Sequence, residues 1–154
     1  MPYSRIFNSS PEACTGCRFC EMVCSLEYDK TGINPERSRI KILNNSDKGL
    51  YTPSTCRLCL DAPCVESCPT QALSQNNETG VVAVDEEECT GCELCIEACE
   101  FNSILMHPEK NVVAICDLCG GELKCIKYCM QKALVFLKPE EYELKKSKIS
   151  DKKS

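Results

Sequence analysis

Cysteine is the residue type with the most chemistry to offer in this chain, which has 16 cysteines among 154 residues. The cysteines form four groups of four with none left over: Cys14, Cys17, Cys20 and Cys24; Cys56, Cys59, Cys64 and Cys68; Cys89, Cys92, Cys95 and Cys99; and Cys116, Cys119, Cys125 and Cys129. Each group opens with C-x2-C and closes with C-x3-C, and the spacer between these pairs is two, four, two and five residues. The chain therefore contains an internal repeat of thiol ligands.

The spacing within a group suits an iron–sulfur cubane. Three thiolates separated by two residues can reach three irons of one [4Fe–4S] cluster, whereas a fourth cysteine three residues later lies about one helical turn further on and faces away from it. In two-cluster ferredoxins with the run C-x2-C-x2-C-x3-C-P, this fourth cysteine binds the other cluster. All sixteen cysteines are therefore predicted ligands, and the prediction is four [4Fe–4S] clusters.

Two other uses of the thiols compete with this prediction. Zinc ribbons also use C-x2-C, but as separate two-cysteine hooks, so zinc is not expected at every group, although one group could still bind it. Disulfides need an oxidising compartment, and the first ten residues lack the apolar region of a secretory signal. We therefore expect reduced thiols, metal binding and a cytoplasmic location.

Charge and composition argue against several other classes of protein. With 18 basic and 23 acidic residues the net charge is −5, which gives nucleic-acid binding no electrostatic support. No run approaches the ~20 apolar residues of a membrane helix, so no membrane insertion is expected. The sequence has no glycine-rich nucleotide motif and a single histidine, His107. The chain thus offers ligands for electron carriers and no visible site for a substrate.

The segments between the cysteines predict an α+β fold that is held largely by its clusters, because apolar residues other than cysteine are few for this length. Strands are expected in four apolar, β-branched runs, at 40–43, 81–84, 111–115 and 134–137. Residues 76–80 are predicted to form the turn of a hairpin whose other arm lies near 72–74. Short helices are expected at 93–99 and 124–129, where the C-x3-C pairs occur.

The cysteine groups and their flanking residues resemble the four-cluster ferredoxin-type subunits of molybdenum and tungsten oxidoreductases. The resemblance covers roughly residues 3–138, and besides the cysteines it rests on Arg5-Ile6-Phe7, Asn34-Pro35-Glu36-Arg37-Ser38-Arg39-Ile40-Lys41, Asp61-Ala62-Pro63-Cys64, Cys68-Pro69-Thr70-Gln71-Ala72-Leu73 and Cys116-Asp117-Leu118-Cys119. The small size is most similar to the subunits that accompany tungsten enzymes of the aldehyde:ferredoxin oxidoreductase family, including class II benzoyl-CoA reductase.

The resemblance implies a nested pairing of the groups, first with fourth and second with third. It assigns Cys14, Cys17, Cys20 and Cys129 to a first cysteine set, Cys24, Cys116, Cys119 and Cys125 to a second, Cys56, Cys59, Cys64 and Cys99 to a third, and Cys68, Cys89, Cys92 and Cys95 to a fourth, with one cluster for each set. Spacing alone also allows the third group to pair with the fourth, because only sixteen residues separate Cys99 from Cys116.

This pairing implies two ferredoxin-like, two-cluster units joined by short hairpins and helices. Residues 1–24 with 110–138 form the expected outer unit, and residues 56–109 form the expected inner unit. Residues 25–55 are expected to connect the two units, partly as a strand. The charged C-terminal tail, residues 139–154, is either solvated or an arm that lies on a partner, and both alternatives remain open.

The resemblance also implies a function: an electron-transfer subunit that relays single electrons through four clusters to or from a larger tungsten or molybdenum pterin subunit in an anaerobic setting. A ferredoxin and further electron-transfer subunits are additional candidate partners, and a stand-alone soluble polyferredoxin is the alternative function. Every cluster would be fully thiolate-ligated, so no catalytic residue is expected. Glu100 places a negative charge directly after Cys99, which predicts a lower potential for the cluster of that set.

Overall fold

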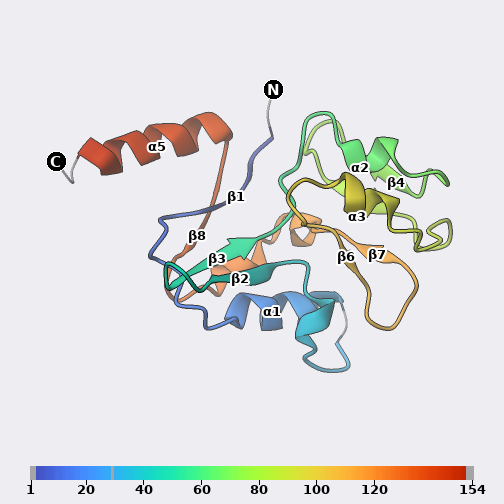
Figure 1. Ribbon diagram of the computed structural model, residues 1–154, viewed down its shortest axis with the longest axis horizontal. Helices are drawn as coiled ribbons and strands as arrows, with labels where there is room; N and C mark the ends of the chain where they lie inside the picture. Colours follow the sequence, from blue (N-terminus) through green and yellow to red (C-terminus); the bar gives the residue numbers. More distant parts are fainter. Residues whose placement is uncertain (1–2, 29, 152–154) are drawn as a thin grey trace.

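The computed structural model describes residues 3–28 and 30–151 and has a mixed α+β fold (Figure 1). The helices are α1 (Phe19–Tyr28), α2 (Pro63–Glu66), α3 (Leu94–Ala98), α4 (Lys124–Lys127) and α5 (Pro139–Asp151), with the 3-10 helices η1 (Pro35–Arg37) and η2 (Leu118–Gly121). The strands are β1 (Arg5–Asn8), β2 (Lys41–Asn45), β3 (Leu50–Ser54), β4 (Leu73–Gln75), β5 (Val82–Val84), β6 (Leu105–Met106), β7 (Val113–Ala114) and β8 (Leu134–Leu137). Met1, Pro2, Asp29 and residues 152–154, which belong to the expected outer unit, connecting segment and tail, lie outside the described residues.

The strands pair into four antiparallel sheets of two strands each, β1–β8, β2–β3, β4–β5 and β6–β7. The four predicted strand runs are confirmed as β2, β5, β7 and β8, with β7 shorter than expected. The predicted turn before β5 is confirmed too, because Asn76 Oδ1 accepts hydrogen bonds from the main-chain N–H groups of Glu78 at 2.8 Å and Thr79 at 3.1 Å. Helices α3 and α4 also fall within their predicted ranges. The α+β class is therefore confirmed.

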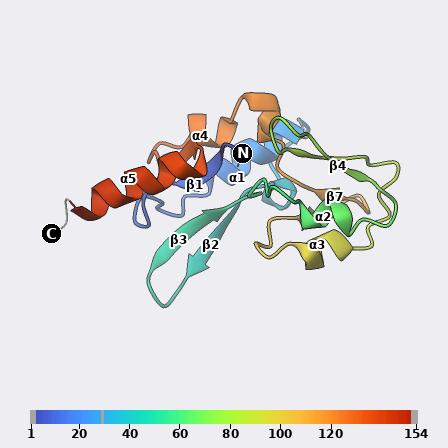
Figure 2. The same ribbon diagram turned by 90° about the horizontal axis from the view of Figure 1, so that it is seen from above.

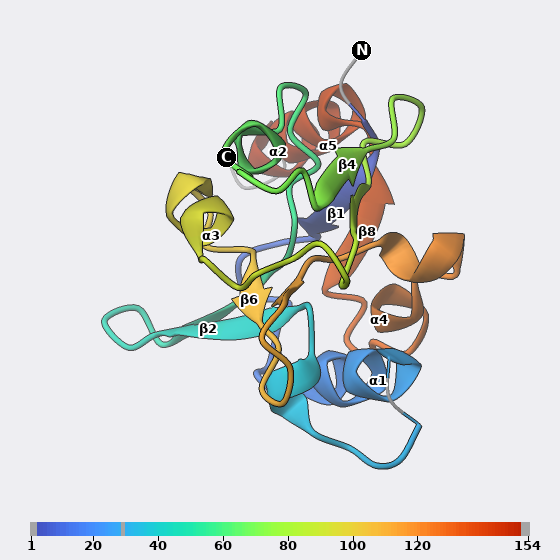
Figure 3. The ribbon, with the colours of Figure 1, turned by 90° about the vertical axis from the view of Figure 1, so that its right-hand side faces the viewer.

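Strand β1 escapes the sequence pattern because its partner, β8, lies near the other end of the chain. The register aligns Arg5 with Leu137 and Asn8 with Leu134, and Figure 3 shows the two strands side by side. Strand β1 buries two adjacent residues, Ile6 and Phe7, so its sequence shows no alternation of apolar and polar residues. Helices α1 and α4, which lie in the first and last cysteine groups, also contact each other. The two ends of the sequence repeat are thus neighbours in space.

Helix α1 is longer than the other helices that lie in cysteine groups. It continues past Cys24 to Tyr28, and Ser25 supplies the backbone N–H that this continuation needs. In the second group Pro69 follows Cys68, and helix α2 ends earlier, at Glu66. Helices α3 and α4 also end before the last cysteine of their groups, at Ala98 and Lys127, although no proline follows those cysteines. A proline is therefore not required for a short helix in a cysteine group.

A buried carboxylate attaches α1 to the connecting segment. Glu21 is 2% exposed, and its Oε1 accepts a hydrogen bond of 2.7 Å from the main-chain N–H of Ile42 in β2. Arg18 lies 3.4 Å from the same carboxylate and offsets its charge. The β2–β3 hairpin then extends away from the body of the molecule (Figure 2). The connecting segment is more ordered than expected, since it contains a helix end, η1 and a complete hairpin.

The end of the molecule away from helix α5 contains α2, α3 and the β4–β5 and β6–β7 hairpins (Figure 1). Helix α2 contacts both α3 and β4. The β6–β7 hairpin pairs Leu105 with Ala114 and Met106 with Val113. The expected limit between inner and outer units, at 109/110, falls inside the turn of this hairpin.

Two clusters of buried residues form the core, and cysteines belong to both. The first contains Ile6, Ile40, Ile42, Leu58, Leu118 and Leu134 together with Cys20, Cys24, Cys116 and Cys125. The second contains Ala62, Leu73, Val82, Ile104, Val113 and Ile115 together with Cys95. Thiols therefore occupy interior positions that apolar side chains fill in an ordinary domain.

The tail forms helix α5, which projects from the body of the molecule (Figure 1). Pro139 starts the helix, and Glu140 and Glu141 follow in its first turn, where acidic residues are favourable. The ring of Tyr142 stacks on that of Phe7 in β1, with ring centroids 4.1 Å apart and planes 10° apart. Within the described part of the chain, every helix is too short or too polar to cross a bilayer.

Candidate iron–sulfur sites

The loop between the first two cysteines of every group has the same local conformation. The residue just before the second cysteine has a positive φ in all four groups: 73° at Gly16, 49° at Leu58, 68° at Gly91 and 60° at Leu118. Left-handed residues next to right-handed ones turn successive backbone N–H groups to one side, which forms a concave site for an anion. The repeat seen in the sequence is thus also a repeat in backbone geometry.

Glycine is required at two of these positions by close packing as well as by φ. A Cβ on Gly16 would lie 2.7 Å from the ring of Tyr51, and a Cβ on Gly91 would lie 2.4 Å from Asn111 Oδ1. Asn111 is held there by a 2.8 Å hydrogen bond from its Nδ2 to the carbonyl oxygen of Thr90. Side chains from other segments of the sequence therefore pack closely against these two C-T-G-C loops.

Leucine occupies the equivalent position in the second and fourth groups, where a left-handed conformation is costly for a side chain with a Cβ. Leu58 and Leu118 are 3% and 8% exposed and both belong to the first core cluster. Burial of these side chains offsets the strain, because a buried leucine contributes ~1.5–3 kcal/mol. The core thus holds these loops in the conformation that glycine permits elsewhere.

Three cavities are each lined by four cysteines, and each foursome draws on two different groups. One cavity is lined by Cys14, Cys17, Cys20 and Cys129. Another is lined by Cys56, Cys59, Cys64 and Cys99. The last is lined by Cys68, Cys89, Cys92 and Cys95. In each of them three cysteines of one group face a cysteine of another group, as in the first, third and fourth cysteine sets.

The remaining four cysteines are also close to one another. Burial raises the pKa of Cys125, and the nearby thiols of Cys116, Cys24 and Cys119 raise it further. Burial likewise raises the pKa of Cys116, where Cys24 and Cys119 again contribute. These are the members of the second cysteine set. Cys24, Cys116 and Cys125 are buried, and helix α1, which carries Cys24, contacts helix α4, which carries Cys125.

Burial has a direct consequence for metal binding. It raises the pKa of Cys20 and of Cys56 to about 12 and that of Cys95 to about 11. Neighbouring thiols add to each shift, because two thiolates close together repel each other. Thiolates are the ligating form, so metal has to displace protons from these interior sites. The donor sets therefore fit positively charged iron well and isolated thiolates poorly.

The pKa shifts of the thiols indicate which sets are neighbours. The nearby thiol of Cys20, in the first set, adds to the raised pKa of Cys125 in the second set. Among the neighbouring thiols, Cys116 of the second set makes the largest contribution to the raised pKa of Cys56 in the third set. Cys64 of the third set makes the largest such contribution to the raised pKa of Cys95 in the fourth set. Cys17 and Cys92, at the two ends of this series, are exposed.

Several groups outside the cysteine motifs act on the sulfurs. The main-chain N–H of Arg39 donates to Cys24 Sγ at 3.2 Å, and that of Ala133 donates to Cys129 Sγ at 3.4 Å. Burial raises the pKa of Cys59, Cys99 and Glu100 raise it further, and Arg5 opposes them. The sequence pattern indicated Glu100 but not Arg5, Arg39 or Ala133. Arg5 and Arg39 are far in the sequence from the cysteines that they affect, and Ala133 acts through its main-chain N–H, which its side chain does not reveal.

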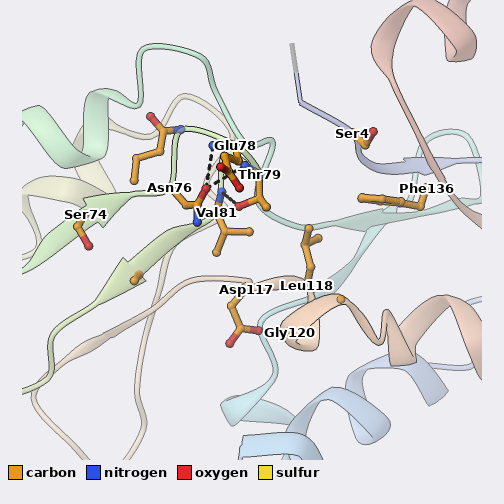
Figure 4. Close-up of a pocket in the computed structure, with 13 residues that line it drawn as sticks. Ser4, Ser74, Asn76, Glu78, Thr79, Val81, Asp117, Leu118, Gly120 and Phe136 are labelled. Atoms are coloured by element: carbon orange, nitrogen blue, oxygen red, sulfur yellow. Dashed lines mark hydrogen bonds between the residues drawn. The ribbon is translucent and has the colours of Figure 1, made fainter. Parts of the chain in front are cut away.

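A groove without cysteines lies between the β4–β5 hairpin and the η2 segment (Figure 4). Ser74 and Val81 line it from the hairpin, and Asp117 and Leu118 line it from the opposite side. Asp117 directly follows Cys116, so the groove gives solvent a route to the surroundings of the second cysteine set.

The arrangement of thiol-lined cavities in small α+β units is that of a ferredoxin-type iron–sulfur protein. The 4Fe-4S dicluster domain family matches residues 48–138. The chain is 46% identical, over 120 residues, to the aliphatic sulfonate oxidoreductase, polyferredoxin-like subunit, of Pyrococcus furiosus; the match covers 78% of this chain and 68% of the relative. It is 30% identical, over 145 residues, to the thiosulfate reductase electron transfer subunit PhsB of Salmonella typhi, covering 86% of this chain and 75% of the relative.

Among solved structures, one chain of the active site complex BamBC of benzoyl coenzyme A reductase has a similar fold. It superposes with a TM-score of 0.50 at 19% identity and covers 97% of this chain and 90% of that chain. This chain belongs to the 4Fe-4S dicluster domain family. It is an iron–sulfur protein of the kind that serves as an electron-transfer subunit of oxidoreductases.

Proposed function

We propose that this chain relays single electrons between an external donor or acceptor and a larger catalytic subunit, through four [4Fe–4S] clusters. The observation that supports this most directly is the set of three cavities that are each lined by four cysteines, with the last four cysteines gathered nearby. When bound, such clusters supply reversible one-electron chemistry. The chain's own residues bind, space and shield the four sites.

The proposed ligands are those of the four cysteine sets in the nested pairing. Contacts between elements favour it: β1 pairs with β8, and α1 contacts α4, which joins the first and fourth groups. Helix α2 contacts α3, which joins the second and third groups. We propose two ferredoxin-like units on this basis, with residues 1–24 and 110–138 in one, residues 56–109 in the other and residues 25–55 between them.

The proposed order of electron transfer is based on which cysteine sets are neighbours. The thiols of the first and second sets are neighbours, as are those of the second and third and of the third and fourth. We therefore propose a linear path from the first to the fourth set. Its ends lie at the exposed residues Cys17 and Cys92, where electrons would pass to and from other proteins.

The proposed partner is a catalytic subunit with a tungsten or molybdenum pterin centre. The names of the two relatives describe subunits of an aliphatic sulfonate oxidoreductase and of a thiosulfate reductase, which favours a subunit over a stand-alone carrier. We place the complex in the cytoplasm of an anaerobic cell, because sixteen free thiols are best preserved under reducing conditions. A ferredoxin is a suitable partner at the other end of the path.

Anaerobic purification of the native protein tests the function. We expect about sixteen irons and as many labile sulfides per chain, a visible band that dithionite bleaches, and a stoichiometric large subunit containing tungsten or molybdenum. A brown protein that purifies alone would favour the stand-alone polyferredoxin. A colourless protein with zinc and no labile sulfide would contradict the proposal.

Serine variants test the pairing separately. In the nested pairing, Cys99→Ser and Cys59→Ser alter the same cluster, whereas Cys119→Ser alters a different one. If the third group pairs with the fourth instead, Cys99→Ser and Cys119→Ser alter the same cluster. Electron paramagnetic resonance of the reduced variants distinguishes the two outcomes, because a serine ligand changes the signal of only the cluster that it binds.

A further inference from the structure

Arg39 contacts several of the segments that carry the second cysteine set. It lies between η1 and β2, and its main-chain N–H donates to Cys24 Sγ at 3.2 Å. Its side-chain Nη1 donates to the carbonyl oxygen of Ile115, the residue before Cys116, at 2.9 Å. One residue from the connecting segment therefore touches both the helix and the loop that carry the cysteines of this set.

Asp117 and Tyr28 complete the surroundings of the Arg39 side chain. The guanidinium carbon lies 3.4 Å from the centre of the Tyr28 ring, and Nη1 lies 3.7 Å from Asp117 Oδ2. The Tyr28 hydroxyl donates to Asp117 Oδ1, which also accepts the main-chain N–H of Cys119 at 2.9 Å. Burial and this hydrogen bond raise the pKa of Tyr28 well above its usual value, so the hydroxyl remains a donor.

The backbone of Arg39 is held as firmly as its side chain. The Thr55 hydroxyl donates to the Arg39 carbonyl oxygen at 3.3 Å. Because Cys56 of the third set follows Thr55 directly, this hydroxyl links Arg39 to the place where the second and third sets meet.

We propose that Arg39 raises the reduction potential of the cluster held by the second cysteine set and that Asp117 lowers it. The proposal rests on the proposed function, since it requires a cluster at this set. Reduction adds negative charge, so a nearby cation favours the reduced form and a carboxylate opposes it. The Arg39 side chain is 20% exposed, so solvent screens its charge poorly. The Asp117 side chain is 40% exposed and lines the groove between the β4–β5 hairpin and η2, so solvent screens its charge more (Figure 4). The cation therefore has the larger effect.

The test compares substitutions that change charge and keep the main-chain contacts. Arg39→Gln preserves the main-chain N–H that donates to Cys24 Sγ. Asp117→Asn keeps a side-chain oxygen that can accept from the Tyr28 hydroxyl and from the main-chain N–H of Cys119. In the full-length protein with its clusters, Arg39→Gln shifts one midpoint downward by about tenfold in the reduction equilibrium, ~59 mV for a one-electron couple. Asp117→Asn shifts the same midpoint upward by a smaller amount, and Arg39→Lys stays close to the parent protein.

Lys110→Gln is the control for net charge. Lys110 pairs with Glu86 at 2.9 Å, with both side chains more than half exposed, and the next residue, Asn111, contacts the loop of the fourth set. Lys110→Gln should not change the midpoint potential that Arg39→Gln shifts. Redox titration followed by electron paramagnetic resonance provides the readout, with iron content measured for every variant.

Opposite shifts of a single midpoint would support the proposal, because a merely structural role cannot reverse its sign between the two variants. Unchanged midpoints at full iron content, or shifts in the same direction, would overturn it. If Arg39→Gln loses iron, Asp117→Asn and Arg39→Lys decide: the former must still raise the midpoint and the latter must retain it. Failure of the proposed function itself would be seen earlier, as a parent protein with no reducible cluster to titrate.

Discussion

At the scale of single residues, the cysteine loops are defined by backbone conformation as much as by thiols. The opening C-x2-C pair of every group has a left-handed residue before its second cysteine, and only two of these four residues are glycine. Where glycine is present, a distant side chain packs against it, and where leucine replaces it, the core supplies the compensation. The loops are therefore coupled to the tertiary structure residue by residue.

Gly91→Ala tests this coupling. Both the positive φ and the contact with Asn111 oppose a Cβ, so we expect a loss of about 1–3 kcal/mol, seen as a lower Tm and reduced iron content under anaerobic conditions. Gly32→Ala is the matched control, because its φ lies outside the left-handed region and no atom lies within 4 Å of its would-be Cβ. The control should be neutral or slightly stabilising. Equal Tm values for the two variants would contradict the argument.

Glu100→Gln tests the charge beside the third cysteine set. Glu100 opposes negative charge on Cys59, whereas Arg5 favours it. Removing the carboxylate should therefore raise one midpoint by less than tenfold, under ~59 mV, because Glu100 is exposed and screened. Glu140→Gln in helix α5 makes the same change of charge away from this set and should leave the potentials unchanged. A redox titration in which Glu100→Gln moves nothing would contradict the expectation.

At the scale of elements, helix α5 stands out because its sequence is polar on all sides. A helix of 13 residues with this composition is marginal in isolation, so its contact with the body matters. The stacking of Tyr142 on Phe7 supplies that contact at the start of the helix. The tail is thus a helix that the body of the molecule anchors at its start, and an arm that lies on a partner stays a prediction.

Tyr142→Ala should release α5. The aromatic pair contributes about 0.5–1.5 kcal/mol beyond burial, so its loss should speed hydrogen exchange of the amides after residue 142 without changing iron content. Tyr142→Phe retains the ring and should behave like the parent protein. Unaltered exchange in Tyr142→Ala would show that other contacts hold the helix.

At the scale of the whole molecule, secondary structure alone is a weak scaffold here. All four sheets have two strands, and three of the five α-helices in the described residues have five residues or fewer. Two-stranded hairpins are at best marginally stable alone. Cysteines from every group lie in or against the two core clusters, so bound metal would tie together segments from both ends of the chain.

Removal of the clusters should therefore unfold the protein. After treatment with acid and chelator, we expect loss of the cooperative thermal transition and rapid proteolysis, because the binding energy of the metal is part of the folding energy. Reconstitution with iron and sulfide under reducing conditions should restore the transition, and that sample is the control for damage during treatment. An apoprotein that keeps the parent Tm would show that packing suffices.

Some elements could be predicted because their determinants are local. The β4–β5 hairpin follows from the turn residues 76–80 and the valine-rich run after them, and α3 and α4 follow from the C-x3-C spacing. Strands β1, β3 and β6 could not be predicted in this way. Each is short and depends on a partner strand for its hydrogen bonds, and the partner of β1 is more than a hundred residues away.

By itself, the sequence determined the candidate ligands: sixteen thiols in four repeated loops, chemistry that suits iron–sulfur clusters, and glycines at positions 16 and 91 of two of these loops. Those are properties of neighbouring residues. Only the tertiary structure decided which cysteines from different groups lie together, and that Arg5, Arg39 and Asp117 surround particular sets. The physical reason is that a cluster site and its electrostatics depend on distances in space, and those distances arise from strand pairing and core packing between segments far apart in the chain.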